Sequence, residues 1–282
     1  MAAVSASMVK ELRERTGLGM MDCKKALVEA DGDIDGAIEI LRKSSGMKAA
    51  KKAGRIAADG VLGSKIEDGK GVVVEINCET DFAAKDESFL AFVNDVTEKV
   101  FDSGSSDIQA LDLESTREAL VQKIGENISV RRAEVFQDEG RIVKYIHTNG
   151  KIGVLLSMEG GSEELGKDIA MHIAAMNPAV VSPDDAPADL VEKERDIYTA
   201  QAQESGKPPE IIEKMIDGRI RKYLSEISLL EQPFVKDGDT KVGALLKKEG
   251  ASIGRFVRLE VGEGIEKEED DFAAEVQKQL GS

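Results

Sequence analysis

The sequence predicts an α+β fold, because two similar segments each combine a β-hairpin with a following helix. The motif Gly-Arg-Ile begins both segments, at 54–56 and at 140–142, and a glycine near the start of the second strand recurs 82 residues apart, at Gly71 and Gly153. An Asp-Gly or Asn-Gly dipeptide, a strong signal for a tight hairpin turn, precedes each of these glycines. Each half is therefore expected to be a small antiparallel sheet covered by a helix.

Helical periodicity places the covering helices over 86–100 in the first half and 163–176 in the second. Their buried faces are predicted to contain Phe89, Phe92, Val93, Val96 and Val100, and Leu165, Ile169, His172 and Ile173. Each sheet needs a third strand, which the alternating segments 128–136 and 252–261 can supply. Everything between 183 and 247 is then an insertion in the second half.

The start of the chain, 7–43, has the pattern of three short helices. Gly17 and Gly19 separate the first two, because glycine favours the backbone angles that end helices, and Asp33 is a suitable N-cap for the third. The apolar side chains expected to remain exposed are those at the turn, Leu18, Met20 and Met21. Methionine suits an adaptable contact surface, so we interpret this bundle as a docking head. The alternative is a small core that keeps its methionines. The basic segment 44–54 is expected to be a linker, in part helical.

Two further helical segments lie within the insertion, on either side of a turn at 205–209. Apolar residues at three- and four-residue spacing mark one side of each segment. A two-helix hairpin cannot shield its apolar surface on all sides, so it either folds back on the core or pairs with another molecule. We favour a homodimer formed through this hairpin.

The last segment of the chain is predicted to be a helix. Phe272, Val276 and Leu280 lie four residues apart, and the acidic residues before them suit a helix N-terminus. This apolar face either lies in a groove of a partner or packs on the body of the chain, and we favour the partner.

The predicted domains are 1–54 (docking head with linker), 55–139 (first half of the core), 140–182 with 229–263 (second half), 183–228 (hairpin) and 264–282 (tail).

Composition narrows the classes of function. The chain carries 54 acidic and 38 basic residues, a net charge of −16, which repels phosphate backbones and makes nucleic acid an unexpected direct ligand. No apolar run approaches the length of a membrane span, and no signal or transit pattern is present. Cys23 and Cys78 give no disulfide framework, which fits a reducing compartment. We expect a soluble, cytoplasmic protein that binds a basic or mixed protein surface.

Motifs for cofactor binding are incomplete. The segment from Gly63 to Lys70 departs from a phosphate-binding loop in spacing and lacks the following Ser or Thr. The segment 31–36 resembles the start of a calcium loop, but the position of the last ligand holds Arg42, a cation. The order of the cysteines and histidines gives no zinc-binding pair. We therefore expect neither a cofactor nor a metal ion.

A cysteine-dependent enzyme is an alternative only if the fold brings Cys78 to a histidine. Cys78 is more simply a core thiol at the end of a strand, and His172 a core or boundary residue of its helix. His147 differs, because it precedes Thr148-Asn149-Gly150 at a hairpin tip, where exposure is expected. It is either a contact residue or an ordinary turn histidine.

The segment Thr80-Asp81-Phe82-Ala83 joins a predicted strand to the helix over 86–100. One interpretation is a protruding loop that presents a carboxylate beside an aromatic ring. Such a pair can disturb a metal–nucleotide site in a partner, because the ring wedges between side chains while the carboxylate competes for their donors. The alternative is structural: Asp81 caps the helix, and Phe82, seven residues before Phe89, continues its buried stripe.

Several long stretches resemble the elongation factor Ts family, the guanine nucleotide exchange factors of elongation factor Tu in bacteria and organelles. They are the head motif from Lys10 to Leu27, Thr80-Asp81-Phe82, the motif Lys-Ile-Gly-Glu-Asn-Ile at 123–128 and the motif from Phe256 to Ile265. The resemblance covers essentially the whole chain. It implies a ubiquitin-associated-like head, a dimerising hairpin, and nucleotide exchange without covalent chemistry.

The resemblance also implies site residues. The family carries a Thr-Asp-Phe-Val loop, implicated in displacing Mg²⁺ from the partner, and Ala83 stands here in place of the usual Val. Implied contacts with elongation factor Tu are Arg13, Met20 and Met21 in the head, Ile124 and Gly125 beside the loop, His147 at the hairpin tip, and Phe272 and Val276 in the tail. The factor would promote GDP release and stabilise the nucleotide-free partner until GTP binds. The competing hypothesis is an interaction adaptor whose head binds a helix or a nascent chain.

Overall fold

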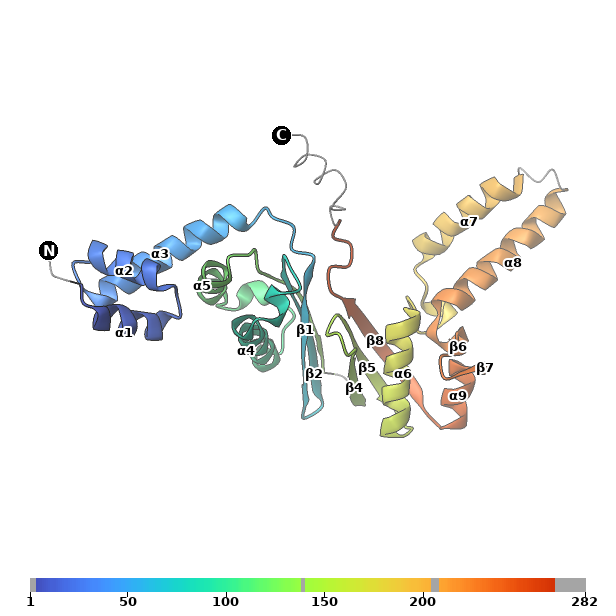
Figure 1. The fold of residues 1–282 in the computed structure, drawn as a ribbon. Coiled ribbons are helices and arrows are strands. Elements are labelled where there is room, and N and C mark those ends of the chain that lie inside the picture. Colours follow the sequence, from blue (N-terminus) through green and yellow to red (C-terminus); the bar gives the residue numbers. More distant parts are fainter. Residues whose placement is uncertain (1–3, 138–139, 204–207, 267–282) are drawn as a thin grey trace, which may run out of the picture.

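The structure, a computed structural model, describes residues 4–137, 140–203 and 208–266. Its α+β class agrees with the sequence prediction. Two sheets face each other in the centre of the molecule, and helices cover the outer face of each (Figure 1). A helical head and a helical hairpin extend from opposite sides of this core.

Both sheets are antiparallel and have the same topology. The strand orders are β1-β2-β3 and β4-β5-β8, so both predicted third strands are confirmed. The strands are β1 Asp59–Glu67, β2 Lys70–Cys78, β3 Ser129–Phe136, β4 Arg141–Ile146, β5 Ile152–Glu159 and β8 Ser252–Glu260. In each sheet the central strand pairs with the third through a register shift, between Glu75 and Ile76 and between Ser157 and Met158. These shifts are 82 residues apart, so the duplication extends to the β-bulge.

The sheets pack on each other through one hydrophobic cluster. Its buried members are Leu62, Val73, Phe136, Ile142, Leu155 and Leu259. The repeated glycines lie at this contact. A Cβ atom at Gly71 would stand 2.7 Å from Ile142, and one at Gly153 would stand 2.8 Å from Leu62. The sheets can approach this closely because neither position has a side chain, which explains why both copies of the repeat carry glycine.

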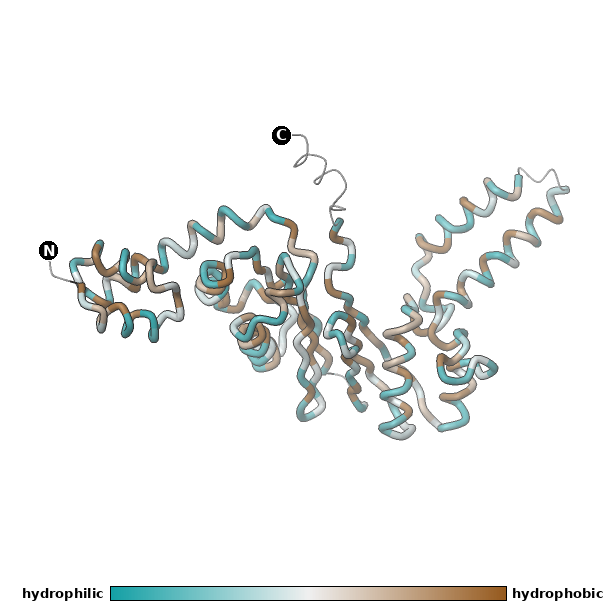
Figure 2. Tube along the Cα trace, viewed as in Figure 1, coloured by the Kyte–Doolittle hydropathy of each residue, from teal (hydrophilic) through white to brown (hydrophobic). Residues whose placement is uncertain are grey.

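The covering helices are α4 (Glu87–Ser103) and α6 (Glu163–Met176). The residues predicted for their inward faces are all buried. Both helices begin at a side-chain cap, Asp86 for α4 and Ser162 for α6. Hydrophobic residues recur along the strands beneath them (Figure 2). In the first half, α5 (Glu114–Ile124) follows a short 3-10 turn, Ile108–Ala110, and packs beside α4.

The head contains the three predicted helices, α1 (Ala6–Thr16), α2 (Met20–Glu29) and α3 (Ile34–Lys52), and Asp33 caps the third as expected. Two expectations for this region were wrong. Leu18 is buried, because the left-handed backbone of Gly17 turns the chain back and carries the next side chain into the bundle. Segment 44–54 is in part helical, as expected, but α3 continues as far as Lys52 and buries Ser45 and Ala49, so this part packs on the core and is not a free linker.

The insertion contains a helical hairpin, α7 (Ala188–Gln203) and α8 (Pro209–Ile227). Its buried residues Ala202, Ile216 and Ile220 form a cluster of their own, and Figure 1 shows both arms extending away from the sheets. Among the described residues, the alternative that the hairpin folds back on the core is therefore wrong. The remaining elements are the 3-10 turns Pro183–Asp185 and Leu229–Glu231, the strands β6 Pro233–Phe234 and β7 Asp237–Lys241, and the helix α9 Val242–Lys248.

After β8 the chain runs to Glu266, where the described residues end. The predicted tail helix, with Phe272 and Val276, lies outside the described residues. Within the ranges that the structure describes, no helix combines the length and the apolarity that a membrane crossing requires.

Candidate partner-binding site

The loop after β2 presents an aromatic ring to solvent beside a carboxylate. Phe82 is 81% exposed. Next to it, Oδ2 of Asp81 lies 2.7 Å from Nζ of Lys85 in an exposed ion pair. Ala83 and Ala84 begin the 3-10 turn Ala83–Lys85 and are both buried. The turn is thus fixed to the core by two small side chains, while the ring and the carboxylate point outward.

The structural alternative for this loop is wrong on both counts. The cap of α4 is Asp86, whose Oδ1 accepts hydrogen bonds from the backbone N–H groups of Ser88 and Phe89 at 2.8 and 3.3 Å. Phe82 does not continue the buried stripe, since Phe89 is fully buried and Phe82 is not. Ala83, expected in the contact loop, faces the core instead, so it supports the turn from inside.

A carboxylate that the sequence analysis did not single out holds the loop in place. Oε2 of Glu126 accepts hydrogen bonds from the backbone N–H groups of Glu79 and Thr80, both at 3.0 Å. Its other oxygen accepts the Thr80 hydroxyl at 2.7 Å, and that hydroxyl oxygen accepts the backbone N–H of Ala83 at 3.2 Å. Bonds to a charged acceptor are about twice as strong as neutral ones. Glu126 therefore clamps the residues immediately before Asp81 and Phe82.

The same short segment also joins the loop to the head. The backbone N–H of Asn127 donates to Oε1 of Glu79 at 2.6 Å, and its side-chain amide donates to the carbonyl oxygen of Arg55 at 2.8 Å. Nζ of Lys52, the last residue of α3, donates to the carbonyl oxygen of Gly125. The turn 125–127 is thus a junction between the end of the head helix and the exposed loop.

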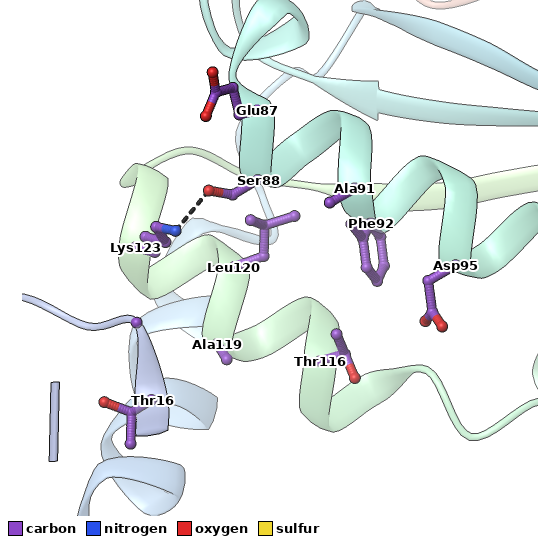
Figure 3. A pocket seen from close by; sticks show the side chains of 11 residues that line it. Thr16, Glu87, Ser88, Ala91, Phe92, Asp95, Thr116, Ala119, Leu120 and Lys123 are labelled. Atoms are coloured by element: carbon purple, nitrogen blue, oxygen red, sulfur yellow. Dashed lines mark hydrogen bonds between the residues drawn. The ribbon is translucent and has the colours of Figure 1, made fainter. Parts of the chain in front are cut away.

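A second set of polar contacts fixes the head against α5. Asp22 accepts hydrogen bonds from Lys48 at 3.3 Å and from the side-chain amide of Gln122 at 3.4 Å. The buried hydroxyl of Ser45 donates to the side-chain oxygen of Gln122. Beside these contacts, a groove of about 490 Å³ separates the Thr16-Gly17 turn from α4 and α5 (Figure 3). The head is therefore held in one orientation and does not hang on a flexible linker.

The head residues that the family resemblance implies as contacts are exposed, whereas Leu18 in the turn beside them is buried. Met20 and Met21 are 58% and 75% exposed, and Arg13 is exposed. Ile124 and Gly125, at the end of α5, are half-buried. The predicted exposure of the two methionines is confirmed.

The hairpin tip that carries His147 lies beside the same edge of the first sheet. His147 is exposed, and its Nδ1 lies 3.0 Å from the Tyr145 hydroxyl. Nζ of Lys151 is 2.8 Å from a carboxylate oxygen of Asp59, and Asp59 pairs with Cys78 at the end of β2. The tip and the exposed loop therefore start from neighbouring points, although their residues are far apart in sequence.

Neither buried candidate supports cysteine chemistry. Burial raises the pKa of Cys78 to about 12, and its thiol donates to the carbonyl oxygen of Thr80 at 3.2 Å. The ring of His172 is fully buried and lies 2.9 Å from the Gln232 side-chain oxygen, while its Nδ1 accepts the backbone N–H of Val235. The interpretations of Cys78 and His172 as core residues are confirmed. Among the described residues, no cluster of three Cys, His, Asp or Glu side chains is suited to hold a metal ion.

Comparison with known proteins identifies the family. The model of the family described as Elongation factor TS matches residues 79–263. The chain belongs to the elongation factor Ts family. It is 64% identical to an elongation factor Ts of Hahella chejuensis and 60% identical to that of Teredinibacter turnerae, over 99% of this chain and 99% and 98% of those proteins. It is 58% identical to the elongation factor Ts of Marinobacter nauticus over its whole length.

The Glu126 clamp is testable by amide hydrogen exchange. In Glu126→Gln the side chain keeps its shape but loses its charge, so the amides of Glu79 and Thr80 should exchange about tenfold faster. The matched control, Glu164→Gln on α6, should leave both amides unchanged. Equal exchange in wild type and Glu126→Gln would show that the carboxylate does not hold the loop.

His172 makes the stability of the fold depend on pH. Burial lowers its pKa below 6.5, although the hydrogen bond with Gln232 acts in the opposite direction. The unfolded chain therefore binds a proton at a higher pH than the folded chain does. Stability from this residue is present above pH 6.5 and is lost on acidification toward the lowered pKa, by up to about 1.4 kcal/mol per pH unit.

Urea unfolding between pH 7.5 and 5.5 measures this effect. The free energy of unfolding should fall more steeply with acidification in wild type than in His172→Asn. His147→Asn removes an exposed histidine and should keep the wild-type slope. The same slope in wild type and His172→Asn would contradict the assignment.

Proposed function

We propose that the protein promotes the release of GDP from elongation factor Tu and then stabilises the nucleotide-free partner until GTP binds. Membership of the elongation factor Ts family supports the partner and the exchange role. In this proposal the protein acts in the cytoplasm, residues 1–54 form a ubiquitin-associated-like docking module, and no covalent bond is made or broken.

The exposed Phe82 carries this proposal. The ring of Phe82 is 81% exposed, so it lacks apolar contacts in the free protein. Two buried alanines and the Glu126 clamp hold the loop that carries it in this position. A rigid support matters, because a mobile side chain would lose more conformational entropy when it enters a partner. The ring is therefore suited to insertion into a second molecule.

Asp81 supplies the second part of the wedge. Its ion pair with Lys85 is exposed on both sides, and pairs of this kind contribute little to stability. The carboxylate can therefore exchange Lys85 for donors of the partner at little cost. In nucleotide-binding proteins Mg²⁺ bridges phosphate oxygens and orders switch segments, so disturbing its surroundings weakens nucleotide retention. We propose that Asp81 and Phe82 act on the Mg²⁺ site of the partner in this way.

The remaining contacts are proposed to come from surfaces next to this loop. A Cβ atom at Gly17 in the head turn would lie 3.8 Å from Nζ of Lys123, and Lys123 precedes Ile124 and Gly125 at the end of α5. Met20, Met21 and Arg13 continue this surface on the head. His147 adds the hairpin tip, and Phe272 and Val276 of the tail complete the proposed grip.

Thermodynamic linkage defines what such a factor can do. If it binds the empty partner more tightly than the GDP-bound partner, GDP must weaken its own binding by the same factor. The protein then speeds exchange without changing the relative affinities of the partner for GDP and GTP.

We also propose that the hairpin mediates a homodimer. Ile197 on α7 and Ile211 on α8 are 48% and 47% exposed, and the arms extend away from the sheets (Figure 1). A second copy of the chain would bury these side chains, and closed two-fold dimers are the commonest assemblies.

Stopped-flow release of a fluorescent GDP from elongation factor Tu tests the exchange role. The chain should accelerate release, and Asp81→Ala combined with Phe82→Ala should slow the stimulated rate by at least about tenfold, equivalent to 1.4 kcal/mol. Val235→Ala removes another exposed apolar side chain, in the second half of the core, and should retain the wild-type rate. Release that is as slow with the wild-type chain as without it would refute exchange and favour an adaptor role.

Sedimentation of the free chain tests the dimer. Replacing Ile197 and Ile211 by Asp should weaken self-association by at least about a hundredfold, because the loss of about 1.5–3 kcal/mol of burial for each isoleucine sums to at least about 3 kcal/mol per chain. Leu90→Asp, at a comparably exposed position on α4, should leave self-association unchanged. A monomeric wild type, or a double variant that still dimerises, would exclude the hairpin as the interface.

A further inference from the structure

A second groove lies on the first half of the core, and its lining includes Arg55 and Asn127 of the junction described above. It has a volume of about 720 Å³ and is enclosed by segment 53–57, the turn Ile108–Ala110 with the start of α5, and the first residues of β3. Its apolar lining comes from Ile56, Ile108, Leu111, Leu113, Ile128 and Val130. Ile56 is 44% exposed, an unusually open position for an isoleucine in a concave surface.

The chain itself enters this groove at its end. Ile265, the last residue but one of the described part, already lines it. The preceding turn is fixed, because the fully buried Glu75 accepts the backbone N–H of Gly262 at 2.8 Å and Arg131 donates to the carbonyl oxygen of Glu263 at 2.5 Å. The described part of the chain therefore ends beside the groove.

The length of this segment allows it to return into the groove. Phe272 lies six residues after Glu266, so its backbone can reach at most roughly 20 Å from that point when the chain is fully extended. The link is short, which gives the segment an effective concentration in the millimolar range at the groove. Weak attraction is enough to fill the groove under these conditions.

Charge favours this occupant. The lining contains Arg55, Arg117 and Arg131 against one acid, Glu114, whereas the whole chain carries a net charge of −16. Residues 266–271 contain five acids and one lysine. The arginines already pair with Glu79, Glu114 and Glu75, so the rim is close to neutral and repels such a stretch less than the strongly acidic remainder of the surface does. Beyond the acids, Phe272, Val276 and Leu280 repeat every four residues and match the apolar lining.

We propose that in the free protein residues 267–282 dock into this groove, with Phe272 and Val276 against Ile56 and the acidic stretch against the arginines. The tail then has two alternative sites, one on its own chain and one on a partner. Docking on its own chain does not depend on the proposed function, whereas competition with the partner does. A partner that binds the tail must first displace it, which lowers the apparent affinity of that partner.

Site-directed photo-crosslinking in the full chain tests the docking without any partner. A benzophenone side chain at position 272 should form adducts within 53–57, 108–113 or 128–131, located by mass spectrometry of the peptides. The matched control places it at Lys278, on the opposite side of a helical repeat, and should give about tenfold fewer adducts there. Mixing isotopically heavy and light chains distinguishes adducts within one chain from those between chains.

Variants of the groove complete the test. Ile56→Asp puts a carboxylate among the apolar lining and close to the acidic stretch, and should reduce the adducts about tenfold. Leu90→Asp, at a comparably exposed position outside the groove, should leave the yield of adducts unchanged. Circular dichroism checks that both variants keep the wild-type fold. Adducts that lie elsewhere, that form only between chains or that persist in Ile56→Asp would each overturn the proposal. GDP release is not measured here, so this result stands apart from that of the exchange assay.

Discussion

The hydrogen bonds to the Glu126 carboxylate determine what the exposed face of this molecule can do. Three donors from Glu79 and Thr80 converge on one charged side chain, and the Thr80 hydroxyl passes the constraint on to Ala83. A large apolar ring would otherwise turn toward the nearest hydrophobic surface, because water disfavours it. The clamp and the buried alanines hold the turn so that Phe82 stays exposed, as the proposed function requires.

The turn 125–127 also connects surfaces that belong to different parts of the chain. Glu126 lies between Gly125, whose carbonyl oxygen accepts a hydrogen bond from Lys52 of the head helix, and Asn127, which donates to Glu79 and to Arg55. A change in the orientation of the head would therefore strain the loop. The contacts between Asp22 and Gln122, 100 residues apart, add a second point of attachment. Head, loop and the end of α5 form one connected surface.

Local patterns were enough to predict both hairpins, their covering helices and the third strands, because alternation, turn dipeptides and helical spacing are all short-range signals. Predictions failed where tertiary packing decides. The sequence at Leu18 is that of an exposed turn, yet the left-handed Gly17 directs it inward, and 44–54 is composed like a linker, yet Ser45 finds a buried partner on α5. Glu126 lies within the motif at 123–128, but nothing in its sequence neighbourhood reveals that its partners lie 46 and 47 residues earlier.

If Asp81 and Phe82 act on a partner as proposed, the relative size of two energies explains why the ring and the carboxylate occur together. Burying an exposed Phe side chain contributes about 1.5–3 kcal/mol, whereas an exposed ion pair contributes about 0–1 kcal/mol. Phe82 can therefore supply most of the attraction, and losing the contact between Asp81 and Lys85 costs less than the ring gains. The carboxylate adds charge where the ring alone would add only contact, and in a water-poor site that charge acts far more strongly than it does in solvent. A pair of this composition is best suited to a partner that offers an apolar recess next to bound cations.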